Sequence, residues 1–178
     1  LKEHPIFHWG PRACRATGTE HPAQQRAAEQ EYMGMLDALE TQLGSTRYAL
    51  GDRPSAVDTI ILGGLRAHTN ADPIPDLSSY TRVLEWEAQC ENGWDGKGEL
   101  APFPKSTSFA QHMLALTRDE YTKFVSSNAK AITAGDKVFQ IETHGEATSY
   151  LAREYPERSR RILRNHAFDP LSNRERDQ

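Results

Sequence analysis

Four residues near the start of the chain have side chains that suit a binding pocket. Phe7, His8 and Trp9 follow one another, and Arg12 lies shortly after them. Ligand pockets are lined mainly by apolar and aromatic side chains, with a few polar groups that orient the ligand. The cluster therefore predicts part of the wall of a pocket for an apolar molecule. The alternative is that Phe7 and Trp9 belong to a core and that His8 is solvated.

Other reactive side chains lack the spacing that a catalytic or metal site requires. Cys14 and Cys90 lie far apart, and neither belongs to a Cys-x-x-Cys pair or a Cys/His ligand pattern. His68, Asn70 and Asp72 form a run that suggests a metal ligand set or a base, but its place after an apolar helix favours helix termination. We therefore predict no metal site and assign no catalytic residue.

Ser55 and Asp58 have the spacing of a capping box. A serine at the cap position bonds a backbone N–H of the first helical turn, and an acidic residue at the third position accepts the N–H of the serine. Residues 59–65 (TIILGGL) are apolar nearly all round, which predicts a helix buried on most sides. Both side chains are thus assigned a structural role, and removing Asp58 is expected to cost about 1–3 kcal/mol.

Amphipathic patterns predict the main helices. Residues 23–43 carry apolar side chains at steps of three and four, and Gly44 follows where a glycine closes a helix. A second helix, capped by Ser78 or Ser79, is predicted to contain Tyr80, Val83, Leu84, Trp86 and Cys90.

The second half of the chain is less regular. The glycine- and proline-rich stretch 91–108 predicts a loop, and residues 119–134 predict a helix that ends at Gly135. Residues 137–143 alternate weakly and suggest a short extended segment. Residues 146–153 are predicted to be helical again.

Residues 50–58 (LGDRPSAVD) resemble the stretch that opens the central core helix in the C-terminal domain of glutathione transferases. The pattern of that family is an apolar residue and a glycine, a short turn, Ser/Thr-x-x-Asp, and then aliphatic residues. The Asp72-Pro73 connector and the Val83-x-x-Trp86 helix also fall where the family would place them, so the resemblance covers residues 23–91.

The resemblance implies an all-α fold in four parts: a helical bundle like the C-terminal domain of glutathione S-transferases, with a helical C-terminal extension. Residues 1–22 would be the end of a first helix and a loop, and residues 23–91 the core. Residues 92–165 would form the extension packed on that core, and residues 166–178 a frayed tail.

The function implied by the resemblance is transfer of glutathione, as co-substrate, to apolar electrophiles. The family binds glutathione mainly through a thioredoxin-like domain, and no part of these 178 residues matches it. The helical domain would supply part of the hydrophobic pocket, with Phe7, His8, Trp9 and Arg12 facing the cleft between domains. A homodimer is compatible with this reading. The alternative is a non-catalytic module that serves protein association.

Composition narrows the class of protein. A formal net charge of −4 argues against a nucleic-acid-binding surface. No apolar run reaches the roughly 18–20 residues of a membrane span, and no basic-then-apolar leader is present, so we expect no membrane association and a cytoplasmic location. Two unpaired cysteines are typical of a reducing compartment. The arginines between 153 and 164 alternate with glutamates, which indicates a solvated face.

Overall fold

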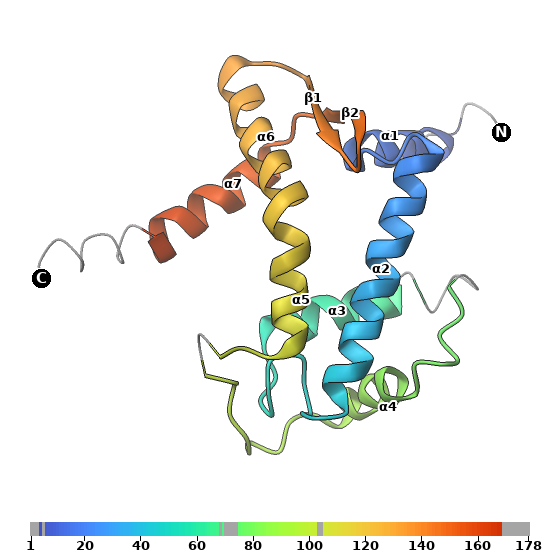
Figure 1. Cartoon of the computed structure of the whole chain (residues 1–178), viewed down its shortest axis with the longest axis vertical. Coiled ribbons are helices and arrows are strands. Elements are labelled where there is room, and N and C mark those ends of the chain that lie inside the picture. The colour runs from blue at the N-terminus through green and yellow to red at the C-terminus, as the bar shows by residue number, and fades with distance from the viewer. Residues whose placement is uncertain (1–3, 5, 68, 70–74, 103–104, 169–178) are drawn as a thin grey trace, which may run out of the picture. The chain divides into compact units, whose positions relative to one another are not determined.

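A computed structural model describes residue 4 and residues 6–67, 69, 75–102 and 105–168 (Figure 1). The chain divides into two compact units, which are described separately. We name residues 29–116 the helical unit, and residues 1–28 together with 117–178 the hairpin unit. The long helix α2 (Pro22–Leu43) contributes to both.

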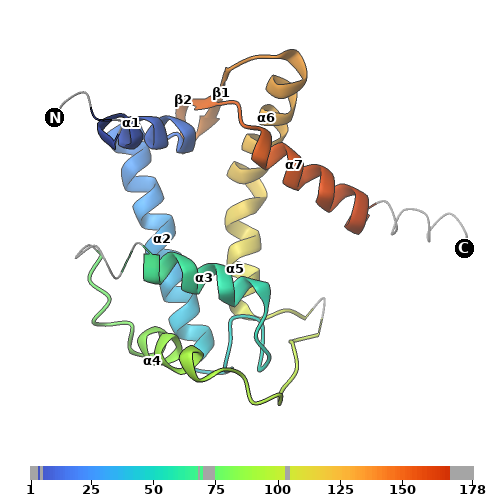
Figure 2. The ribbon, with the colours of Figure 1, turned by 180° about the vertical axis from the view of Figure 1, so that it is seen from behind.

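The helical unit is built around a core of aliphatic and aromatic side chains. Besides α2, its elements are α3 (Ala56–Ala67), α4 (Thr81–Gln89), the short 3-10 helix η2 (Cys90–Asn92) and α5 (Ser108–Leu116). Figure 2 shows α3 crossing α2 and α5. The core side chains are Leu36, Leu39, Tyr48, Ala49, Ile61, Leu65, Leu77, Tyr80, Val83, Trp86 and Phe109. The predicted helix over 23–43 and its end at Gly44 are confirmed.

The loop between α2 and α3 is held by a close backbone approach at Gly51. Its carbonyl accepts the Tyr48 N–H at 2.8 Å, and its neighbour Asp52 donates its N–H to the Glu99 carbonyl at 2.8 Å. Gly51 has φ 136°, and an added Cβ would lie 2.7 Å from backbone atoms of Glu99 and Ala101. Only glycine fits a position that combines this φ with this approach.

Helix α4 is capped by α2 rather than by its own sequence. Tyr80 is the N-cap and makes no side-chain cap bond, so the predicted serine cap is wrong. Instead the Glu40 carboxylate accepts the backbone N–H groups of Arg82 at 3.2 Å and Val83 at 3.0 Å. A carboxylate at a helix N-terminus satisfies otherwise unpaired N–H groups and complements the helix dipole. This contact fixes α4 against α2.

The hairpin unit combines helices with a two-stranded antiparallel sheet. Its elements are α1 (Ile6–Thr17), the start of α2, the π-helix η3 (Thr117–Tyr121), α6 (Thr122–Ala134), β1 (Val138–Thr143), β2 (Glu146–Leu151), α7 (Glu154–Leu163) and the π-helix η4 (Arg164–Phe168). Helix α6 packs on β1, and α1 packs on β2.

The strands are joined by a turn at His144 and Gly145, which both have positive φ, at 52° and 76°. Two consecutive residues with positive φ are typical of the tight turns that match the twist of a hairpin. Phe124 of α6 packs on the hairpin, with ring centroids 5.7 Å from Phe139 and 5.2 Å from Tyr150.

The hairpin corrects the all-α prediction, because the chain is mostly helical with a small sheet. The extended segment suggested at 137–143 is confirmed as β1, but the helix predicted over 146–153 is wrong. Residues 146–151 form β2, in which Thr148 and Tyr150 are both buried. Buried side chains at alternate positions are the pattern of a strand with one covered face.

Helix α1 also differs from the prediction. It continues through Gly10 and Pro11 to Thr17, where a loop was expected. A proline normally disfavours the α conformation of the preceding residue, because its Cδ clashes with the Cβ and N–H of that residue. Gly10 has no Cβ, which relieves part of the clash.

Helix α3 is not buried all round as predicted. Ile61 and Leu65 face the core, whereas Ile60 is 74% exposed. An added Cβ on Gly63 or Gly64 would meet nothing within 4 Å. The helix therefore presents an outer face of Ile60, Gly63 and Gly64, which we name the α3 outer face.

Candidate functional site

The predicted pocket residues lie on α1. His8, Trp9 and Arg12 are exposed, with Trp9 at 69%. The Phe7 side chain lies outside the described residues. Positions three and four apart are neighbours on a helix surface, so the structure brings Trp9 and His8 beside Arg12 on one side of α1. These side chains face solvent in this chain, and Trp9 is not part of a core.

The structure brings Ser55 and Asp58 together at the start of α3. The Ser55 N–H and hydroxyl each donate to Asp58 Oδ2 at 2.8 Å, and the Val57 N–H donates to Ser55 Oγ at 3.2 Å. Asp58 Oδ1 accepts a further bond from the Ala49 N–H at 2.9 Å. Asp58 is only 3% exposed. Its carboxylate thus ties the loop before α3 to the helix, and both oxygens are occupied by protein donors.

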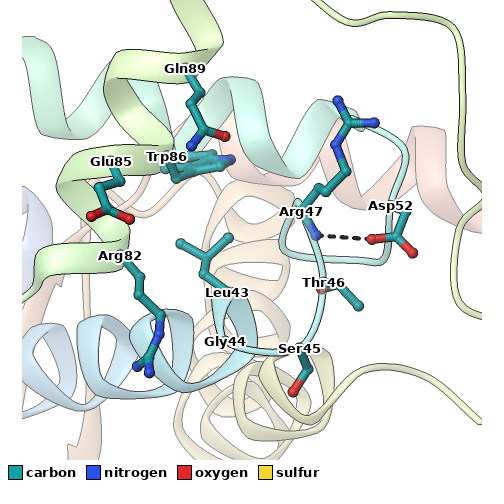
Figure 3. Close-up of a pocket in the computed structure, with 10 residues that line it drawn as sticks. All are labelled: Leu43, Gly44, Ser45, Thr46, Arg47, Asp52, Arg82, Glu85, Trp86 and Gln89. Carbon is teal, nitrogen blue, oxygen red and sulfur yellow. Dashed lines mark hydrogen bonds between the residues drawn. The ribbon is translucent and has the colours of Figure 1, made fainter.

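A cavity of about 420 Å³ opens in the helical unit, where the end of α2 and the turn after it meet α4 (Figure 3). We name it the Trp86 pocket. Its lining residues are Leu43, Gly44, Ser45, Thr46, Arg47, Asp52, Arg82, Glu85, Trp86 and Gln89. The volume lies within the range of about 300–1,000 Å³ that small-molecule sites occupy.

The Trp86 side chain carries an unsatisfied donor in this pocket. Trp86 is 3% exposed, and its buried Nε1 has no hydrogen-bond partner among the described residues. In Figure 3 the indole lies beside Leu43, with its nitrogen on the side of Arg47 and Asp52. A buried donor without a partner destabilises a protein by about 1–3 kcal/mol. A ligand that accepts a hydrogen bond from this N–H would remove that cost.

Arg47 and Asp52 form one side of the pocket. The Arg47 N–H donates to Asp52 Oδ1 at 3.0 Å, and its guanidinium Nη1 donates to Asp95 Oδ1 at 3.0 Å and to the Lys97 carbonyl at 3.4 Å. Two hydrogen bonds lower the pKa of the Asp95 carboxyl: the larger effect comes from the Lys97 backbone N–H and the smaller from the Arg47 side chain. The bond to Asp95 in turn raises the pKa of Arg47. Arg47 and Asp95 therefore stay charged, and the guanidinium N–H groups of Arg47 other than those on Nη1 can donate to a ligand.

Arg82 and Glu85 form the opposite side. Arg82 Nη1 lies 3.5 Å from Glu40 Oε1, in a contact that is half-exposed on the arginine side. Glu85 is exposed and makes no hydrogen bond or ion pair among the described residues. The formal charges of the four lining ionisable groups cancel, with Arg47 and Arg82 against Asp52 and Glu85.

The remaining candidates are the His68, Asn70 and Asp72 run and the two cysteines. Among the described residues, no group of three or more His, Cys, Asp or Glu could hold a metal ion. His68, Asn70 and Asp72 lie outside those residues. Cys14 and Cys90 are not in disulfides, and burial raises the pKa of the Cys90 thiol, which disfavours the reactive thiolate.

The Trp86 pocket was missed at the sequence level. Trp86 was identified there as a residue of an amphipathic helix, which it is. The pocket arises because the turn at 44–47 and α4, distant in sequence, meet at this position. A buried tryptophan still has an N–H that needs an acceptor, so Trp86 itself was the feature of the sequence that could have indicated a polar pocket.

Comparison with known proteins gives one match. The model of the family described as "Glutathione S-transferase, C-terminal domain" matches residues 22–88. No curated protein and no solved structure matches the chain. Within the described part of the chain, every helix is too short or too polar to span a bilayer.

Proposed function

We propose, from the match of residues 22–88 to the model of the glutathione S-transferase C-terminal domain family, that this protein acts in glutathione transfer. In this role the helical unit packs against a thioredoxin-like domain and forms part of the pocket for an apolar electrophile. Glutathione would be bound mainly by the thioredoxin-like domain. The family match is the observation on which the proposal rests.

The α3 outer face supports the contact between domains. Ile60 is 74% exposed, and an added Cβ on Gly63 or Gly64 would meet no atom of the described residues within 4 Å, so the face is open to close approach. Contiguous exposed apolar surface is typical of an interaction site. Because α3 lies within the matched residues, this face is where we expect the partner domain to pack.

The helical unit supplies a wall rather than the chemistry. Conjugation requires a glutathione thiolate, since the thiol itself is a poor nucleophile. Asp58 is occupied by three protein donors and the pKa of Cys90 is raised, so neither suits activation of a thiol. The activating group is therefore expected on the thioredoxin-like domain. The same open α3 face would also serve a non-catalytic module that binds another protein.

The test compares the 178-residue chain with the product of the complete reading frame around it. Glutathione binding is measured by calorimetry, and conjugation with a chromogenic electrophile. We expect binding and turnover only in a protein that includes a thioredoxin-like domain. Saturable binding with turnover by the 178 residues alone would contradict the proposed division of roles. A complete product that associates with a partner but has no turnover would favour the non-catalytic module.

Two matched variants test the α3 outer face. Ile60→Glu places a charge on this face, and Ile162→Glu makes the same change at a half-exposed position of α7. We expect Ile60→Glu to weaken association with the thioredoxin-like domain and Ile162→Glu to leave it unchanged. Equal effects of the two variants would remove the α3 outer face from the proposal.

A further inference from the structure

We propose that the Trp86 pocket binds a small zwitterion, a molecule such as an amino acid or a dipeptide that carries both a carboxylate and an ammonium group. The inference does not rest on the proposed glutathione transfer, because none of the lining residues was assigned a role in that reaction. It rests on three observations: an unsatisfied buried donor, the charges on the two sides, and the volume.

The buried donor requires a ligand that accepts a hydrogen bond. In the part of the chain that the structure describes, Trp86 Nε1 has no hydrogen-bond partner, although Trp86 is only 3% exposed. Its nitrogen lies on the side of Arg47 (Figure 3). Arg47 uses Nη1 for Asp95 and Lys97, which leaves its other guanidinium N–H groups for a ligand. An indole N–H beside a guanidinium favours binding of a ligand carboxylate, which can accept hydrogen bonds from both.

The opposite side favours a cation. In Figure 3 Glu85 lies across the pocket from Arg47. Among the described residues Glu85 makes no hydrogen bond or ion pair, whereas Arg82 on the same side is engaged by Glu40. Asp52 is similarly engaged, by the Arg47 N–H. The groups left for a ligand are therefore a donor pair at one side and a carboxylate at the other, which together complement a zwitterion.

The size of the pocket agrees with this class of ligand. A volume of about 420 Å³ greatly exceeds the roughly 30 Å³ that one water occupies in the liquid. Because the lining charges cancel, a ligand of large net charge would meet as much repulsion as attraction. A net-neutral molecule with separated charges avoids that penalty.

The test uses three dipeptide probes that share the same two glycines and differ in which terminus is charged. Glycylglycine has both charges, N-acetylglycylglycine lacks the ammonium, and glycylglycinamide lacks the carboxylate. The readout is the indole N–H signal of Trp86 in a ¹⁵N-labelled chain, assigned by comparison with Trp9→Phe and Trp94→Phe variants. We expect glycylglycine to shift this signal saturably and both other probes to bind about threefold or more weakly, as partly exposed ion pairs allow.

A variant distinguishes the charge pairing from general binding. Glu85→Gln should weaken binding of glycylglycine about two- to fivefold and leave binding of N-acetylglycylglycine unchanged, because Glu85 has no partner among the described residues that the change would disturb. Glu99→Gln, an exposed change outside the pocket, serves as the control. The proposal is overturned if no probe shifts the Trp86 signal, if N-acetylglycylglycine binds as well as glycylglycine, or if Glu85→Gln behaves like Glu99→Gln.

Discussion

Replacing Asp58 by alanine should strongly destabilise the helical unit. The carboxylate accepts the backbone N–H groups of Ala49 and Ser55 and the hydroxyl of Ser55. Ala49 is fully buried and Asp58 is 3% exposed, so water cannot easily replace the lost acceptor. At about 1–3 kcal/mol for each buried donor left unpaired, the two N–H groups give an expected loss of about 2–6 kcal/mol. This exceeds the value expected from a capping box alone, because the bond to Ala49 is additional.

Two further variants divide this loss between the bonds. Asp58→Asn keeps one acceptor oxygen and places an amide donor where the other stood, so it should fall between wild type and Asp58→Ala. Ser55→Ala removes the hydroxyl bond to Asp58 and the acceptor of the Val57 N–H, for about 0.5–2 kcal/mol. Because Ser55 and Asp58 share a bond, the double alanine variant should cost less than the sum of the two single variants.

Urea unfolding followed by tryptophan fluorescence measures these differences, since buried Trp86 lies in the helical unit. Glu99→Ala, an exposed acidic residue of the same unit, is the control and should unfold with wild type. An Asp58→Ala midpoint equal to that of Glu99→Ala would refute the reasoning. So would Asp58→Asn being as unstable as Asp58→Ala, because the remaining oxygen would then contribute nothing.

Three other variants test individual contacts. Gly51→Ala should cost about 2–4 kcal/mol in the same urea assay, because its φ of 136° and its backbone approach at 2.7 Å both exclude a Cβ; a neutral result would contradict that geometry. Glu157→Gln should lose about 1–2 kcal/mol at neutral pH. Hydrogen bonds from Arg160 and Arg161 lower the pKa of Glu157 to about 2, so its contribution is present above pH about 4.5 and lost as the pH falls through about 2; a pH-independent difference in unfolding midpoint would count against this. Tyr80→Phe removes a 2.9 Å bond to Asp37 and should cost about 1–2 kcal/mol. Burial, and then that bond, raise the pKa of Tyr80 to about 12, so its contribution is full below pH about 10 and declines as the pH rises through about 12; a midpoint difference that persists there would exclude the effect.

Local sequence rules predicted the elements whose determinants lie within them. The helix over 23–43 has its apolar stripe and its closing Gly44 in one stretch, and the structure gives α2 nearly the same bounds. The Ser55–Asp58 contact likewise spans a single turn. The cap of α4 was mispredicted for the opposite reason. Its acceptor is Glu40 of another helix, and no pattern near Thr81 records that contact.

The hairpin shows a second limit of local reasoning. Residues 146–151 contain alanine, glutamate and leucine, which suit a helix as well as a strand. Pairing with 138–143 decides between them, because it gives the backbone its partners and buries Thr148 and Tyr150 on one face. The turn at His144 and Gly145, both with positive φ, was the local feature that favoured a hairpin. Residues 146–151 therefore form a strand rather than a helix because they pair with β1 across the turn.

The mismatch at α3 has a different origin and a functional meaning. The apolar composition of 59–65 predicts burial on most sides, yet this chain covers only the side with Ile61 and Leu65. A soluble protein normally exposes single apolar side chains, so Ile60 by itself would need no explanation. The explanation is needed because Ile60 lies beside two glycines that weaken the helix, although the described residues leave room there for a Cβ. Residues of this kind lower stability unless something packs closely against them. We therefore propose that the α3 outer face is a contact surface rather than part of a folded core, and Ile60→Glu is the substitution that distinguishes these two roles. Loss of association at unchanged unfolding midpoint identifies a contact surface, whereas a lowered midpoint identifies a core position.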